Sequence, residues 1–119
     1  MRLDRLPERR LPGGLRLAEA SGPRARLLGL AGLRALPHGR ALRIPRCRSV
    51  HTFGMRFPLD LVWLDGRGAV LGLSPGVAAR RVAGCREARS VIEARAGEGP
   101  AFAAAVAAAD REAQAVSSV

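Results

Sequence analysis

The sequence predicts a small α+β domain, with a mostly antiparallel curled β-sheet or barrel-like sheet, one early helix and a C-terminal helix. Three observations lead to this fold class. Short apolar or alternating runs between residues 41 and 94 are typical of strands, Asp65–Gly68 reads Asp-Gly-Arg-Gly as in a hairpin turn, and residues 100–116 are rich in Ala. At 119 residues the chain has room for one domain with a modest core.

The first third of the chain predicts one strand and one helix. Residues 1–12 are charged and irregular, which indicates a flexible N-terminal segment. In Leu15–Ala20 apolar and polar residues alternate as in a short edge strand. Leu residues recur at helical spacing in Arg24–Leu36, and Pro37–Gly39 would end that helix.

The remainder of the chain predicts a succession of strands and then a helix. The strands are expected at Ala41–Ile44, Ser49–Met55, Leu61–Leu64, Ala69–Leu73 and Arg89–Ala94. Pro100–Val116 begins with a Pro in its first turn and has a high helix propensity, but its apolar face is thin. We therefore expect a single globular domain at 13–99, followed at 100–119 by an Ala-rich helix that docks weakly.

The positive charge of the chain is concentrated in one segment. All 20 basic residues are Arg, and the formal net charge is +10. Residues 20–59 hold eight Arg and no Asp or Glu. The absence of Lys, Asn and Tyr is typical of a GC-rich bacterium, so the preference for Arg over Lys need not reflect function. The acid-free segment nevertheless indicates an anionic partner.

Three kinds of partner fit such a basic segment: a small anionic ligand, an acidic protein surface and a nucleic acid. The aromatic content is only 3%, and base-stacking side chains are a usual part of single-strand nucleic-acid binding sites. A non-enzymatic binding module for a small anion or acidic partner is therefore the favoured function, and a nucleic-acid accessory protein is the alternative.

The composition also bears on compartment and cofactors. Met1–Arg10 lacks the apolar stretch of a signal peptide, and no run approaches the length of a membrane span. We expect a cytoplasmic protein without a membrane partner, in which Cys47 and Cys85 are thiols. The two Cys have no paired Cys or His at metal-binding spacing, so we expect neither a metal nor a cofactor.

The most informative segment spans residues 46–60. Its Arg residues are the ones that folding explains least, and His51 and Asp60 are its other polar candidates. The candidate ligand-binding residues are therefore Arg46, Arg48, His51, Arg56 and Asp60.

An enzyme that uses Cys47 is a further alternative. Arg residues flank Cys47 and would favour its thiolate, and His51 and Asp60 could act as base and orienting carboxylate. In an extended strand, however, Cys47 and His51 would lie about 13 Å apart, which is too far for a hydrogen bond. We therefore predict no catalytic residue. Cys47 is more simply a small buried side chain, His51 a half-buried strand residue, and Asp60 an acceptor of backbone N–H bonds that fixes the turn after Pro58.

The stretch SVHTFGMRFPLDLVWLDGRGAVL resembles the central motif of the domain of unknown function 192 family, with its Pro-Leu-Asp, apolar strand and Asp-Gly turn. Arg26–Leu30 and Ala88–Gly97 are similar to the family's early helix and later strand. Phe53–Phe57 departs from the family's aromatic-Met-Lys-Asn form, so any role of that Asn does not transfer, and the family's closing Gly-Asp strand is not evident. The resemblance implies a compact, mainly β domain with a helix, and no established activity or cofactor.

Overall fold

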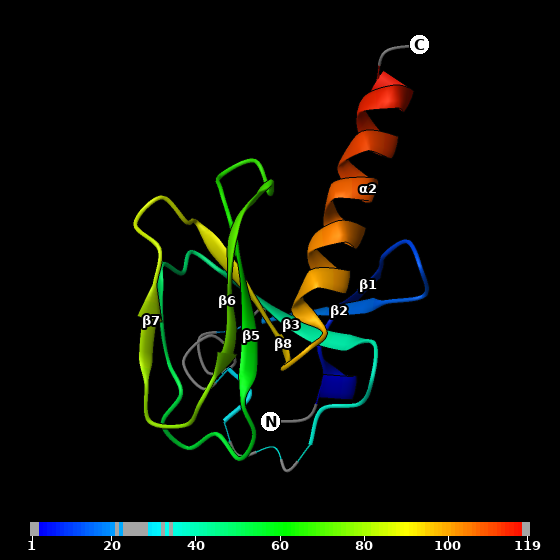
Figure 1. The fold of residues 1–119 in the computed structure, drawn as a ribbon. Coiled ribbons are helices and arrows are strands. Elements are labelled where there is room, and N and C mark those ends of the chain that lie inside the picture. The colour runs from blue at the N-terminus through cyan, green and yellow to red at the C-terminus, as the bar shows by residue number, and fades with distance from the viewer. Residues whose placement is uncertain (1–2, 21, 23–28, 32, 34, 118–119) are drawn as a thin grey trace.

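An open β-sheet forms the centre of the computed structural model, which describes residues 3–20, 22, 29–31, 33 and 35–117. Six strands follow the order β1 (Glu8–Arg10), β2 (Arg16–Glu19), β3 (Arg40–Pro45), β8 (Ser90–Arg95), β5 (Leu59–Leu64) and β6 (Val70–Val77). All neighbours are antiparallel except β2 and β3, which are parallel. β4 (Ser49–His51) and β7 (Val82–Gly84) form a separate antiparallel ladder, on the side of the sheet away from the C-terminal helix (Figure 1).

The α+β class and the mostly antiparallel sheet are confirmed. The barrel-like form is not, because β1 and β6 are the two edges of the sheet in the described part of the chain and do not pair with each other. The strands expected at Ala41–Ile44, Leu61–Leu64 and Arg89–Ala94 correspond to β3, β5 and β8, and the Asp65–Gly68 turn joins β5 to β6. The strand expected at Ser49–Met55 ends earlier, at His51, where Thr52 becomes buried and its Oγ1 donates to the Ala78 carbonyl at 2.6 Å.

The N-terminal segment contains regular structure where we expected an irregular chain. A 3-10 turn, η1 (Leu3–Arg5), precedes β1, and Leu3 and Leu11 are buried. β1 pairs with β2, so the strand predicted at Leu15–Ala20 lies one position in from the edge rather than at it. The three residues of β1 are all exposed and charged, so no apolar alternation in the sequence signals this strand.

The predicted early helix lies largely outside the described residues, since 23–28, 32 and 34 are not among them. Of that range, residues 29–31 form a turn, and Leu30 and Leu36 are buried in the core. This core lies on one face of the sheet, where Leu42, Leu61 and Val91 share a buried cluster with Leu30, Leu36 and Val50 of β4.

The C-terminal helix α2 (Gly99–Ser117) confirms the helix expected at Pro100–Val116. Its N-terminal half packs Phe102, Ala105 and Val106 against Val62 and Ile92 on the second face of the sheet. Residues 111–116 are exposed, and the C-terminal half projects past the strands (Figure 1). The first half of the helix is therefore the part that the sheet holds. Two adjacent interior strands, β8 and β5, are covered on both faces and are buried along almost their whole length.

Candidate functional site

Arg46, Arg48 and Arg89 together line a surface cavity of about 380 Å³. Arg46 directly follows β3 and Arg89 directly precedes β8, and the last residue of β3 pairs with the first residue of β8. The two Arg residues therefore lie at the same end of one antiparallel ladder. The N–H of Cys47 donates to the Arg89 carbonyl at 3.1 Å, which continues the pairing past the ladder. Arg48 enters the cavity from the start of β4.

The backbone turns sharply where the chain passes from β3 toward β4. Arg46 has a φ of 51°, in the left-handed region that non-glycine residues seldom adopt. Such conformations cost about 1 kcal/mol or more and persist where the surroundings fix them. The hydrogen bond from Cys47 to Arg89 supplies that constraint. The side chains of Arg46 and Arg48 therefore project from either side of a residue that is anchored beside the start of β8.

The guanidinium of Arg89 is oriented by neutral acceptors. The Arg89 guanidinium donates through Nη1 to the carbonyl oxygens of Glu87 and Ala88, at 3.4 and 2.9 Å. These acceptors are neutral, so they orient the guanidinium without cancelling its charge. Arg48 and Arg89 form no ion pair with any carboxylate in the described part of the chain. A concave surface that collects guanidinium groups focuses positive potential and attracts anions.

The structure separates the other predicted site residues from this cavity. His51 is exposed on β4, with its ring centroid 6.0 Å from that of Phe53, rather than half-buried as expected. Arg56 is exposed in the loop before β5 and does not line the cavity. Of the five predicted ligand-binding residues, Arg46 and Arg48 are therefore the two among the described lining residues of this cavity.

Asp60 is a structural residue at the centre of the fold, with 2% of its surface exposed. Its Oδ2 accepts the N–H groups of Gly97 and Gly99 at 2.9 and 2.8 Å, and its Oδ1 accepts that of Gly76 at 2.8 Å. The prediction that Asp60 accepts backbone N–H bonds is confirmed. The donors belong to β6, to the turn between β8 and α2, and to the start of α2, however, and not to the turn after Pro58.

Both cysteines are half-buried thiols that pack against the core. Cys47 Sγ donates to the Ser49 carbonyl at 3.2 Å. Among the residues that the structure describes, no cluster of three or more His, Cys, Asp or Glu could hold a metal ion. Over the same residues, no helix has both the length and the apolar character needed to cross a bilayer.

Arg89 is the cavity residue that the sequence analysis missed. One signal could have found it, because the triplet Arg-Ser-Val occurs twice, at 48–50 and at 89–91. In each case the Arg stands directly before a strand. The two strand entries lie close together, since the N–H of Cys47 reaches the Arg89 carbonyl, so the repeated triplet marks the two sides of the cavity.

The fold and the central motif both have counterparts among known proteins. The model of the DUF192 family, described as "Uncharacterized ACR", matches residues 10–109. The chain belongs to this family. The match extends from the end of β1 into the middle of α2, and it confirms the resemblance carried by the Pro58–Asp60 motif and the Asp-Gly turn. No curated protein matches the DUF192 chain.

Two solved structures are similar to this DUF192 chain. One is a protein of unknown function from Novosphingobium aromaticivorans, with a TM-score of 0.63, 12% identity, and coverage of 83% of this chain and 88% of the other. The second is a "putative transcription regulator" from Sinorhizobium meliloti, with a TM-score of 0.65, 19% identity, and coverage of 80% and 82%. At these identities the likeness shows a shared fold.

Proposed function

We propose that this DUF192 chain is a non-enzymatic binding module whose cavity of Arg46, Arg48 and Arg89 takes a small anion or the acidic group of a partner. The convergence of these three side chains on one concave surface is the observation that supports the proposal. A guanidinium presents a planar fork of donors that matches the oxygens of a phosphate or a carboxylate.

The size of the cavity is consistent with a small ligand. Its volume of about 380 Å³ falls near the lower end of the roughly 300–1,000 Å³ range of ligand pockets. Two of the three Arg residues, Arg46 and Arg48, come from the acid-free segment 20–59. Two carbonyl groups already restrict the Arg89 side chain. Less of its conformational entropy would therefore be lost when an anion binds.

Titration with pyrophosphate at two ionic strengths, followed by calorimetry, tests the proposal. We expect binding that weakens as salt rises, because the contacts are between partly exposed charges. Arg48→Gln and Arg89→Gln should each weaken binding about tenfold, which corresponds to the loss of a charge-assisted hydrogen bond.

Arg56→Gln is the matched control, because Arg56 belongs to the same acid-free segment, is exposed and lies outside the cavity. Its affinity for pyrophosphate should equal that of the unaltered protein. The absence of binding at low salt, affinity that does not depend on salt, or equal losses in all three variants would contradict the proposal.

A nucleic-acid accessory role is the second candidate, and the basic segment 20–59 is what favours it. A structural neighbour described as a "putative transcription regulator" is compatible with this role. Gel-shift titrations with duplex and single-stranded DNA distinguish the two. A steep dependence of DNA affinity on salt would favour the nucleic acid, provided that Arg56→Gln weakens DNA binding as much as the cavity variants do.

A further inference from the structure

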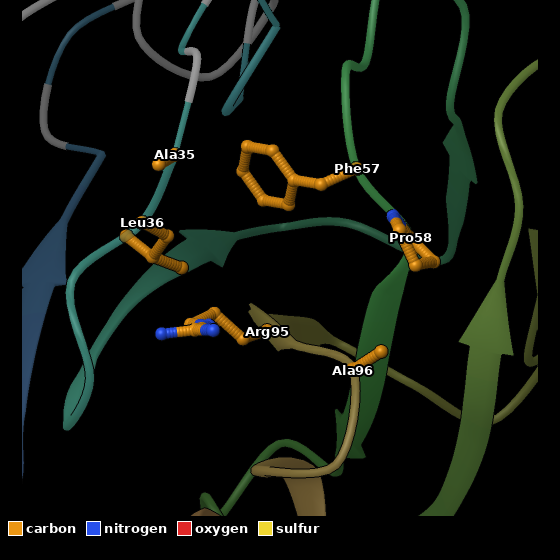
Figure 2. Close-up of a pocket in the computed structure, with 6 residues that line it drawn as sticks. All are labelled: Ala35, Leu36, Phe57, Pro58, Arg95 and Ala96. Carbon is orange, nitrogen blue, oxygen red and sulfur yellow. The ribbon is translucent and has the colours of Figure 1, made fainter.

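A second, smaller pocket lies at the other end of β8. Its described lining residues are Ala35, Leu36, Phe57, Pro58, Arg95 and Ala96, and its volume is about 230 Å³. Figure 2 shows the Phe57 ring, from the loop before β5, and the Arg95 side chain, from the end of β8, projecting toward the side where Ala35 and Leu36 lie. The N–H of Ala96 donates to the Pro58 carbonyl at 3.4 Å, which joins the two strand ends behind the pocket.

Arg95 differs from every other half-buried Arg in the described part of the chain. Arg16, Arg40 and Arg43 are also half-buried, and each forms an ion pair with a carboxylate at 3.4 Å or less. The Arg95 guanidinium has no carboxylate within 4.0 Å among the described residues. A partly desolvated charge without a carboxylate partner is unfavourable. An external anion that pairs with the Arg95 guanidinium would therefore be stabilised there.

The carboxylate that comes nearest in sequence is already engaged elsewhere. Glu93 lies two residues before Arg95 on β8, and residues at this spacing share one face of a strand. Glu93 is buried, and its Oε1 accepts the N–H of Leu30 at 3.2 Å. The guanidinium of Arg95 instead reaches the pocket that Leu36 and Phe57 line.

We propose that this pocket binds a small apolar carboxylic acid, with Arg95 pairing with the carboxylate while Leu36, Phe57 and Pro58 contact the hydrocarbon part. One guanidinium fork matches one carboxylate in a bidentate geometry. The apolar walls disfavour a phosphate, which is more highly charged and would lose more hydration in them. The volume lies below the roughly 300–1,000 Å³ typical of ligand pockets, which restricts the ligand to a small one.

This proposal is independent of the anion cavity, because the two sites share no residue. Benzoate is a suitable probe, and benzamide is its uncharged counterpart of almost the same shape. Titration of the ¹⁵N-labelled full chain, followed by amide shifts, reports both affinity and location. We expect benzoate to shift the amides of Phe57 and Ala96, and benzamide to bind at least about tenfold more weakly.

Two substitutions and one control separate the role of the Arg95 charge from the role of the apolar wall of the pocket. Arg95→Gln should weaken benzoate binding at least about tenfold, whereas Arg56→Gln, which removes an exposed charge next to Phe57, should leave it unchanged. Phe57→Ala should weaken benzoate more than acetate, because only benzoate has a ring to pack there. Phe57→Ala also provides an answer if Arg95→Gln fails to fold.

Saturating pyrophosphate should not displace benzoate, since pyrophosphate belongs at the other cavity. Displacement would overturn the assignment, because it would place benzoate among Arg46, Arg48 and Arg89. Equal affinity for benzoate and benzamide, full binding by Arg95→Gln, or no binding of benzoate at low salt would each overturn the proposal as well. The last three of these results do not depend on whether pyrophosphate itself binds.

Discussion

Glu93 is a carboxyl group in the middle of the apolar core, 3% exposed and opposite Leu42 and Leu61 on the neighbouring strands. Its Oε1 accepts the N–H of Leu30, and Gly29 approaches so closely that an added Cβ would lie 2.7 Å from the same oxygen. Gly29 also has a φ of 53°, so any side chain there would be strained as well as crowded. Glu93 thereby fixes the backbone of residues 29–30 against the sheet.

Burial raises the pKa of Glu93 from 4.5 to about 7, opposed by the hydrogen bond from Leu30. The folded protein therefore retains a proton that the unfolded chain has lost between these two values. We expect the free energy of unfolding to fall as pH rises from about 4.5 to 7, by about 3 kcal/mol, and then to level off.

Glu93→Gln keeps a carbonyl oxygen for the Leu30 N–H but cannot ionise. The free energy of unfolding of this variant should therefore not decrease between pH 4.5 and 7 on account of residue 93. Urea denaturation of both proteins at pH 5 and pH 8 measures the difference. If the free energies of unfolding of the two proteins decreased equally between pH 5 and pH 8, Glu93 would not be the group that causes the decrease.

Asp60 uses both carboxylate oxygens, whereas an Asn at this position would have one acceptor oxygen and one amide donor. Asp60→Asn would direct an NH₂ group at backbone N–H groups and leave at least one of them unsatisfied. We expect a loss of about 3 kcal/mol in the free energy of unfolding, measured by urea denaturation.

Asp65→Asn is the control for this substitution. Asp65 in the β5–β6 turn accepts the N–H groups of Arg67 and Ala69 through Oδ1 alone, and an Asn can keep both bonds. Its effect should be clearly the smaller of the two. Equal losses in the two variants would mean that the geometry around Asp60 is not what makes it important.

The helix α2 shows how unevenly one element contributes to stability. Phe102 is fully buried on the sheet, whereas Val116 is 76% exposed beyond it. Phe102→Ala should cost about 3–5 kcal/mol in the free energy of unfolding, and Val116→Ala should change it by less than about 0.5 kcal/mol. Thermal or urea denaturation checks both values. A large effect of Val116→Ala would indicate that the distal half of the helix packs against something in solution.

Elements with a local signal could be predicted from the sequence, and those that depend on a distant partner could not. The β5–β6 hairpin has its Asp-Gly turn, and α2 has its helix-forming composition. β1 and β7 have three residues each and no buried alternation, and each is a strand because it pairs with another. The same reason limits the site, since Arg89 joins Arg46 only through the β3–β8 ladder.

At the scale of the whole molecule, the excess positive charge shapes both binding and stability. With a net charge of +10, like charges repel one another throughout a small fold. Ion pairs such as Arg43–Glu19, which stay partly open to solvent, offset this only in part, because solvent screens such pairs.

We therefore expect the melting temperature to rise as NaCl increases from about 10 mM to 150 mM, since salt screens the repulsion. Differential scanning calorimetry measures this directly. A melting temperature that falls with added salt would show that attractive ion pairs outweigh the repulsion.

The three hydrogen bonds of Asp60 also have a consequence for the order of folding. They span 16, 37 and 39 residues, so Asp60 reaches β6, the turn after β8 and the start of α2 only when large loops have closed. Contacts between residues so far apart in the chain form slowly, because a large loop must close first. We expect the capping of α2 to form after the folding transition state, so Asp60→Asn would mainly accelerate unfolding and leave the folding rate nearly unchanged.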